Sequence, residues 1–219
     1  DVLNFITGSV SRMILDDTSR ISLSNNDASG AVGTTIFGYL AGDDIASGGI
    51  NNTLFGHNAG HELKLADNNV AIGKDAMFNS FISDAQEVYT KENVYIGALA
   101  GGGDWSTAGS YGNVGIGAYS SDSVQNGALY NTAVGFGSLG ELTTGDFNIA
   151  IGAESGKSNS SGTNNIAIGS WDDSGTTIKG ALGSNTTGQY NIAIGTGALS
   201  TANENDNDGT VAIGHLACQ

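Results

Sequence analysis

The chain has 219 residues, of which 35 are glycine and none is proline, and its net charge of −15 comes from 22 acidic against 7 basic residues. Glycine this frequent without a Gly-X-Y period excludes collagen, and a hydrophobic content of 39% excludes a disordered tail. The shortage of Lys and Arg argues against nucleic acid as a partner and against binding to anionic membranes. No apolar stretch approaches the roughly 20 residues of a membrane-spanning helix.

The chain divides into two parts. We expect residues 1–30 to form a β-rich fibre or shaft segment. Residues 31–219 contain a short motif that recurs ten times and ends on glycine at positions 38, 56, 73, 97, 117, 135, 152, 169, 195 and 214. Asparagine stands four positions before eight of these glycines, and Thr34 and Thr210 replace it in the first and last copies.

Each copy predicts one short β-strand. Val, Ile or Thr lies three positions before the glycine, a bulky apolar residue lies one position before it, and the residue between them is mostly Ala. This alternation has the period of two that is typical of a strand. We expect the bulky residues to fill the interior and the small residues to face outward.

A unit of 17 to 18 residues cannot bury an apolar face alone, so neighbouring copies must stack. The sequence therefore predicts an all-β, parallel β-solenoid in which identical residues repeat about every 4.8 Å. The asparagines are expected to hydrogen-bond along the stack, as in other asparagine ladders. Gly49, Gly145, Gly162 and Gly188 each lie three residues before a repeat asparagine, which predicts a positive φ at those positions. The glycine content and the lack of a 3.6-residue period exclude a helical repeat.

The small size of each coil suggests that a single chain buries too little apolar surface to be stable alone. A column of small residues on the outer strand face permits close packing against other copies, which favours a homotrimer. The alternative is that this face is merely small and exposed to solvent.

The repeat segments resemble those of a known family of fibre proteins. The segments 68–77 (NNVAIGKDAM), 131–139 (NTAVGFGSL) and 148–156 (NIAIGAESG) resemble the repeats in the YadA-like head of trimeric autotransporter adhesins. The longer spacing with TTG turns is closer to phage tail fibres and related bacterial surface fibres, including those of predatory bacteria. Residues 4–17 are similar to a segment that often precedes such repeats, with Arg12, Met13, Ile14 and Asp16 as the matching positions.

This resemblance implies a left-handed β-roll or β-helix that forms a homotrimeric fibre outside the cell, on a bacterium or a virion. Its expected function is attachment to a bacterial host or prey surface, with a glycan or envelope receptor as the partner. Because the sequence shows no catalytic set, we expect no enzyme activity and no cofactor.

Three insertions interrupt the even spacing, at about 78–92, 101–112 and 171–190. Loops that project from solenoids often bind, and Trp beside Asp suits a sugar, since the ring covers the apolar face and the carboxylate accepts from hydroxyls. The alternative is that each aromatic packs over its own loop. The candidate ligand-binding residues are Asp104, Trp105, Tyr111, Trp171, Asp172, Asp173 and Tyr190.

No catalytic or metal-binding set is evident. Asp172 and its neighbour Asp173 point apart on an extended chain, as do Asp43 and Asp44, so neither pair forms an acid–base couple. His57, His61 and His215 are scattered, and the run at 203–209 lacks the final Glu of a calcium loop. A tailspike-like glycan-degrading β-helix remains the alternative function, and an ice-binding solenoid is disfavoured because Thr is absent from many rungs.

Overall fold

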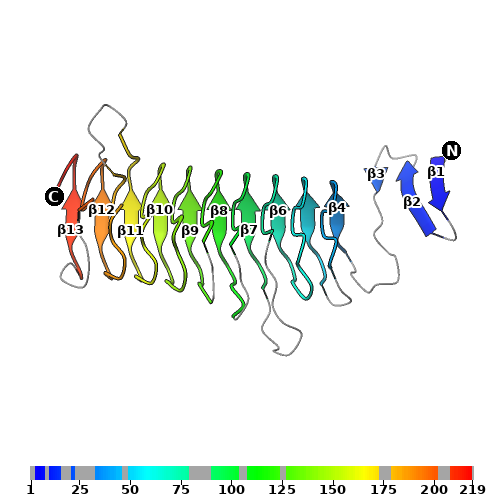
Figure 1. Ribbon diagram of the computed structural model, residues 1–219, viewed down its shortest axis with the longest axis horizontal. Helices are drawn as coiled ribbons and strands as arrows, with labels where there is room; N and C mark the ends of the chain where they lie inside the picture. The colour runs from blue at the N-terminus through cyan, green and yellow to red at the C-terminus, as the bar shows by residue number, and fades with distance from the viewer. Residues whose placement is uncertain are drawn as a thin grey trace.

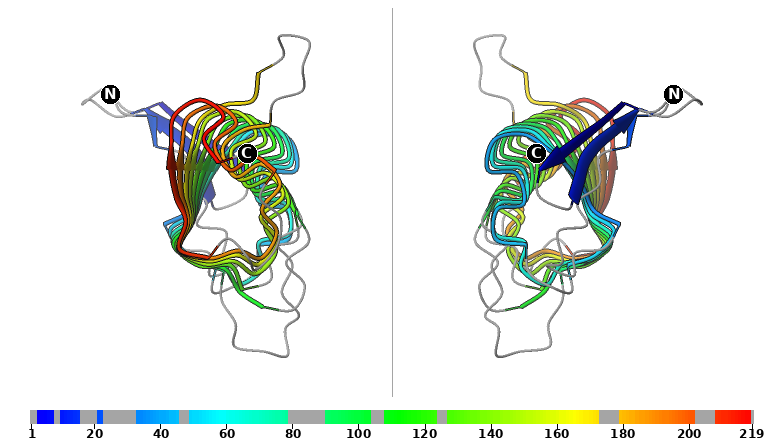
Figure 2. Two further views of the ribbon diagram at one scale, coloured as in Figure 1. Left: turned by 90° about the vertical axis from the view of Figure 1, so that its left-hand side faces the viewer. Right: turned by 90° about the vertical axis from the view of Figure 1, so that its right-hand side faces the viewer.

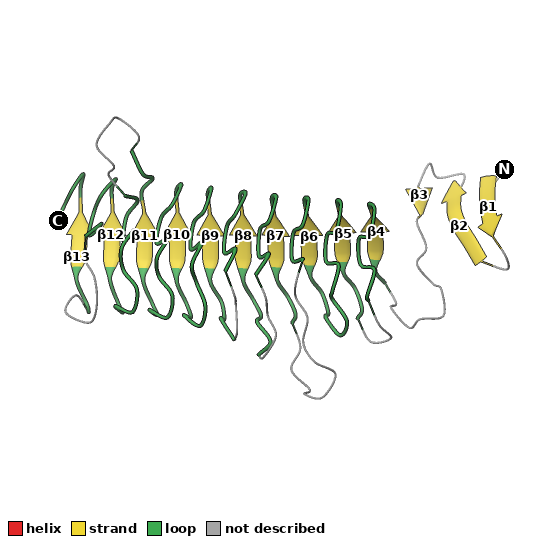
Figure 3. Ribbon diagram, in the orientation of Figure 1, coloured by secondary structure: helices red, strands yellow, loops and turns green. Residues whose placement is uncertain are grey.

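The computed structural model describes residues 3–7, 10–15, 21–22, 33–45, 49–78, 90–103, 108–123, 127–172, 179–201 and 208–218. These residues form strands and loops (Figure 3). An antiparallel sheet near the N-terminus contains β1 (Leu3–Thr7), β2 (Val10–Leu15) and β3 (Ile21–Ser22) in that order.

The remaining ten strands form one parallel sheet in strict sequence order (Figure 1). Corresponding residues of neighbouring strands pair directly, so that Ile149 lies beside Ile166 and Ala150 beside Ala167. Viewed from the end, the successive coils nearly superimpose (Figure 2). The predicted β-solenoid is confirmed. The strands are β4 (Thr35–Phe37), β5 (Thr53–Phe55), β6 (Val70–Ile72), β7 (Val94–Ile96), β8 (Val114–Ile116), β9 (Thr132–Val134), β10 (Ile149–Ile151), β11 (Ile166–Ile168), β12 (Ile192–Ile194) and β13 (Val211–Ile213).

A column of buried asparagines joins the coils, as the sequence predicts. Asn165 directly precedes β11, and both its backbone N–H and its Nδ2 donate to Oδ1 of Asn148 in the preceding coil, at 3.0 and 3.1 Å. Nδ2 of Asn165 also donates to the carbonyl of Gly188 in the next coil, at 2.7 Å. The same three bonds recur at Asn69, Asn93, Asn113, Asn131 and Asn148. Each of these amides is thereby satisfied by the coils above and below it, whereas the buried Nδ2 of Asn191 has no hydrogen-bond partner among the described residues.

Threonine occupies the two ends of this column for a related reason. The Oγ1 of Thr34 accepts a hydrogen bond from the backbone N–H of Asn52 at 3.3 Å, in place of an amide oxygen. At the other end, the N–H of Thr210 donates to Oδ1 of Asn191 at 3.0 Å. The ladder is therefore continuous from the first coil to the last.

The glycine three residues before the asparagine has a different role from the one predicted. Its φ is not in the left-handed region; instead, a Cβ at Gly145 would lie 2.4 Å from the carbonyl oxygen of Gly162 in the next coil. The prediction of positive φ there is wrong, because glycine is required by close backbone approach. The left-handed residue is the one directly before the asparagine, such as Asn164 (φ 58°) or Tyr190 (φ 59°).

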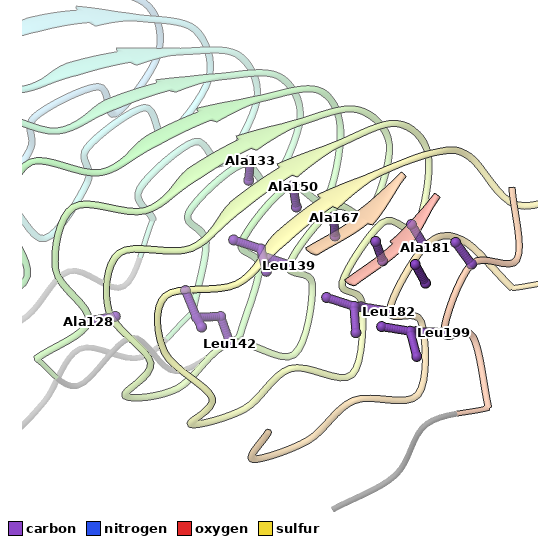
Figure 4. Close-up of a cluster of buried hydrophobic side chains, with 12 residues drawn as sticks. Ala128, Ala133, Leu139, Leu142, Ala150, Ala167, Ala181, Leu182 and Leu199 are labelled. Carbon is purple, nitrogen blue, oxygen red and sulfur yellow. The ribbon is translucent and has the colours of Figure 1, made fainter. Parts of the chain in front are cut away.

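The sheet has its faces reversed relative to the sequence prediction. The middle residue of each strand points inward: Ala133 and Ala150 are fully buried (Figure 4). The flanking β-branched residues point outward, and Ile151 and Ile213 are 41% and 68% exposed. The alternation identifies two faces but not their polarity, and the small face is the inner one because leucines from the far side of the coil fill the space beside the alanines.

The interior is filled by residues that compensate for one another in size. Where the strand carries Ala, leucines from the far side of the coil meet it, including Leu139 and Leu182 (Figure 4). Where the strand carries Tyr95, the facing residue is Gly101, whose added Cβ would lie 2.7 Å from the ring. The interior is thus packed close to its limit.

Loss of one ladder amide should be costly. We expect Asn165→Ala to lower the free energy of unfolding by about 3 kcal/mol, because buried partners in two neighbouring coils lose their hydrogen bonds. The adjacent Asn164 is exposed and left-handed, so Asn164→Gly should change stability by only a few tenths of a kcal/mol. Urea unfolding of both variants checks this, and equal effects would refute the ladder's role.

The face reversal also predicts a mutational effect. Ala150→Leu should destabilise the fold by about 1–3 kcal/mol, because the extra methyl groups enter a filled interior. Ala153→Leu, at a partly exposed corner position, serves as the matched control. Thermal unfolding in which both variants melt together with the parent chain would contradict an inward-facing Ala150.

Candidate functional site

The outer face of the parallel sheet is apolar along its whole length. This outer sheet face consists of the first and third residue of each strand from β4 to β13, and none of these residues is buried. Ten strands spaced by about 4.8 Å extend it over roughly 43 Å. All of its members are uncharged, and they are Val, Ile, Phe or Thr. A monomeric protein rarely leaves so long an apolar strip in contact with water.

Aromatic rings add to this face at its N-terminal end. Phe37 and Phe55 stack with their centroids 5.0 Å apart and remain 55% and 52% exposed. Exposed aromatic residues are enriched at the centres of protein interfaces. The outer sheet face therefore has the composition of an interface between protein chains.

A second feature lies at the corner that follows the strands. The residue two positions after the repeat glycine forms a column in which each N–H donates to the preceding coil, as Tyr119 does to Ala98 at 2.9 Å and Glu154 does to Phe136 at 2.8 Å. Tyr119, Gly137, Glu154 and Trp171 occupy this column in four successive coils. At Gly137 the side chain is missing, and an added Cβ would meet only Glu154 Cγ at 3.7 Å.

This gap opens a groove of about 270 Å³, here called the corner groove. Tyr119 and Phe136 form one wall, with their rings edge to face and their centroids 5.5 Å apart. Both rings are about half exposed, at 43% and 52%. The groove is lined by Tyr119, Asp122, Phe136, Gly137, Gly140, Glu141, Glu154 and Lys157.

The electrostatics of the corner groove are acidic. Three carboxylates line it, whereas Lys157 is its one cation and pairs with Glu154 at 2.8 Å. Asp122 is partly buried, and this burial raises its pKa from 3.8 to about 6. A carboxyl with a raised pKa in a groove is typical of a functional site.

A second hollow of about 310 Å³ adjoins the groove and shares Glu141, Glu154 and Lys157 with it. Lys179 lines this hollow, and its Nζ donates to Oγ of Ser184 at 2.7 Å. The aromatic rings and Asp122 therefore line only the corner groove, whereas Lys179 lines only the second hollow.

The structure separates the residues predicted to bind a ligand. Tyr190 is 62% exposed directly before the ladder residue Asn191, whereas Trp171 is 37% exposed at the corner after β11, near the other end of the strands. Tyr111 belongs to the coil itself, bridges Lys91 and Leu129, and contacts the Tyr130 ring edge-on at 5.3 Å. Asp172 is partly buried beside Trp171. Asp104, Trp105 and Asp173 lie outside the described residues.

Sequence reasoning missed the corner groove because its residues come from three coils and form no contiguous motif. One signal does exist in the sequence. Alignment on the repeat glycine places Tyr119, Gly137 and Glu154 in one column, where a glycine between two large side chains indicates a hollow.

His57 and His61 have different neighbours. His57 stacks on Tyr39 with centroids 5.6 Å apart, while His61 lies in a group with Asp44 and Glu62 whose potential ligand atoms fall within 4.8 Å. Acidic groups of this kind are common on protein surfaces, and we assign no metal to them.

The fold defines the chain as a β-solenoid repeat protein. No family model, no curated protein and no solved structure matches the chain. Among the residues that the structure describes, none belongs to a helix with the length and hydrophobicity needed to cross a membrane.

The raised pKa of Asp122 predicts a pH dependence. Between about pH 4 and pH 6 the folded chain binds the proton that the unfolded chain has released, so this carboxyl lowers stability as pH rises through that window. Asp122→Asn should therefore have a free energy of unfolding on the order of 1 kcal/mol higher than that of the parent chain at neutral pH. This is less than the full pKa shift would give, because the carboxyl is partly exposed to solvent. Denaturation at several pH values checks this, and a stability difference that does not vary with pH would contradict it.

Proposed function

We propose that the chain is the non-enzymatic head or tip of a fibre made of three copies, and that the fibre attaches to the surface of a bacterial host or prey cell through a glycan. The repeats' resemblance to YadA-like heads and phage tail fibres supports the left-handed coil, the number of copies and an extracellular location. The solenoid suits a rigid fibre because every coil is hydrogen-bonded to the next.

The outer sheet face is the observation that carries this proposal. It provides two residues on each of ten strands, which is close to the 20–30 residues that a standard interface contributes from each side. Association of copies along this face removes an apolar strip from water and explains why the strip lacks charge. A partner that covers the whole face must extend along the fibre axis for the same length. A second copy of the chain meets this requirement.

A charge on the outer sheet face should disrupt assembly. We expect the parent chain to be a trimer in light scattering, and Ile151→Asp to shift it towards monomer, because burying an unpaired carboxylate in an apolar interface is costly. Ser161→Asp places the same charge on an exposed residue outside this face and should leave the trimer intact. A parent chain that is monomeric at all concentrations would overturn the assembly.

Attachment is tested on cells. The fluorescently labelled trimer should bind to the surface of some members of a panel of bacteria, and mild periodate oxidation of the cells should abolish binding because it cleaves sugar diols. Binding that survives periodate would identify a protein receptor instead of a glycan, and the absence of binding across a broad panel would contradict adhesion.

The corner groove keeps one alternative function open. Asp122, whose pKa is raised to about 6, and the nearby Glu141 line one groove, and a pair of carboxyls in different environments is the arrangement of glycosidases. A glycan-degrading enzyme would release reducing ends from envelope polysaccharide, and Asp122→Asn would stop the release. If the parent chain releases no reducing ends, this result supports the non-enzymatic fibre.

A further inference from the structure

We propose that the corner groove binds a sugar that carries a free, protonated amine. The ammonium group lies against the rings of Tyr119 and Phe136, and the carboxylates of Asp122 and Glu141 are its counter-ions. This inference rests on the proposed function, in which the fibre recognises a glycan, and it names the chemical class of that glycan.

The shape of the groove fits one sugar unit and not a flat surface contact. Gly137 leaves the space that a side chain fills in neighbouring coils, and Gly140 likewise contributes no side chain to the lining. The volume of about 270 Å³ is just below the usual range for pockets that hold drug-sized ligands, which begins at about 300 Å³. A monosaccharide within a longer chain occupies such a space while the rest of the chain continues along the surface.

The aromatic wall supplies two kinds of contact. Tyr119 and Phe136 stand at 67° to each other, so a bound ring that lies on one of them presents its edge to the other. The apolar C–H face of a sugar packs on an aromatic ring, and a cation is attracted to the ring face. Because both rings are about half exposed, they are accessible without any rearrangement of the coil.

The charges select for a cation. Lys157 already pairs with Glu154, and among the described residues the other two carboxylates of the groove, Asp122 and Glu141, have no such ion pair. Burial is the cause of the raised pKa of Asp122, so its charged form gains most from a bound positive group. An acidic sugar would meet like charges here, and the net charge of −15 also repels it.

The test compares two oligosaccharides that differ only in acetylation. Binding of chitosan pentasaccharide, which has free amines, and of its fully N-acetylated counterpart is measured by calorimetry at about pH 6.5, where a substantial share of the amines is charged. We expect the free-amine form to bind at least about tenfold more tightly. Tyr119→Ala and Asp122→Asn should each weaken that binding by about tenfold, since the first removes one of the two rings and the second one of the two carboxylates that contact the cation.

Two control variants separate the groove from the remaining surface. Tyr39→Ala removes an exposed aromatic ring far along the stack, and Asp43→Asn removes an exposed carboxylate from the same early coil. Both should leave chitosan binding unchanged. Circular dichroism and light scattering confirm that all four variants keep the fold and assembly of the parent chain.

Each outcome decides between the inference and the function on which it rests. Equal binding of the two pentasaccharides, reduced by Tyr119→Ala, would overturn the amine specificity and leave the glycan-binding fibre in place. Binding that the two groove variants do not change would overturn the groove as the site. Amine-specific binding in the groove, combined with no attachment to any bacterial cell, would support the site and overturn the cell-attachment function.

Discussion

The buried asparagine ladder is the interaction on which the rest of the structure depends. From Asn69 to Asn165 each amide reaches both neighbouring coils: Asn148 donates to Asn131 on one side and to the carbonyl of Gly162 on the other. A slip of one residue would leave every amide of the column buried without partners, at a cost of about 1–3 kcal/mol for each. The ladder therefore fixes the register of the parallel strands, and the register determines which side chains line the interior, the outer sheet face and the corner.

Two surfaces follow from this register, and we propose a separate role for each. Along the sheet, repetition produces a uniform surface, because Val, Ile, Thr or Phe at the same two positions of every coil makes a continuous apolar strip. At the corner, a break in the repeat creates the groove. Gly137 has no side chain at the position where Tyr119 and Glu154 have large ones in the adjacent coils. In the function we propose, the solenoid thus separates assembly, which needs a uniform surface, from recognition, which needs an irregular one.

The sequence was sufficient to predict the repeat, the parallel stack and the ladder, because each of these shows as identity at a fixed spacing. It could not determine the polarity of the sheet, since alternation identifies two faces equally well, and Ala150 is the inward residue because leucines from the far side of the coil fill the interior. It also assigned positive φ to Gly145, although that glycine is required by the approach of Gly162 and the left-handed residue is Phe147. The groove was not predicted because contact between coils joins residues 17 or more positions apart, as at Tyr119 and Phe136. The predicted candidates were spread along the coil instead, with Trp171 and Tyr190 near opposite ends of the strands.

The most direct test of this account is thiol labelling of cysteines placed on the two faces of β10, in a Cys218→Ser background. The account predicts that the thiol of Ala150→Cys reacts only after unfolding. The thiol of Ile151→Cys should be protected in the assembled fibre and become reactive when Ile168→Asp separates the copies. A rapidly labelled Ala150→Cys in the folded chain, or protection of Ile151→Cys that Ile168→Asp does not remove, would contradict the inward alanines or the association along the outer sheet face, respectively.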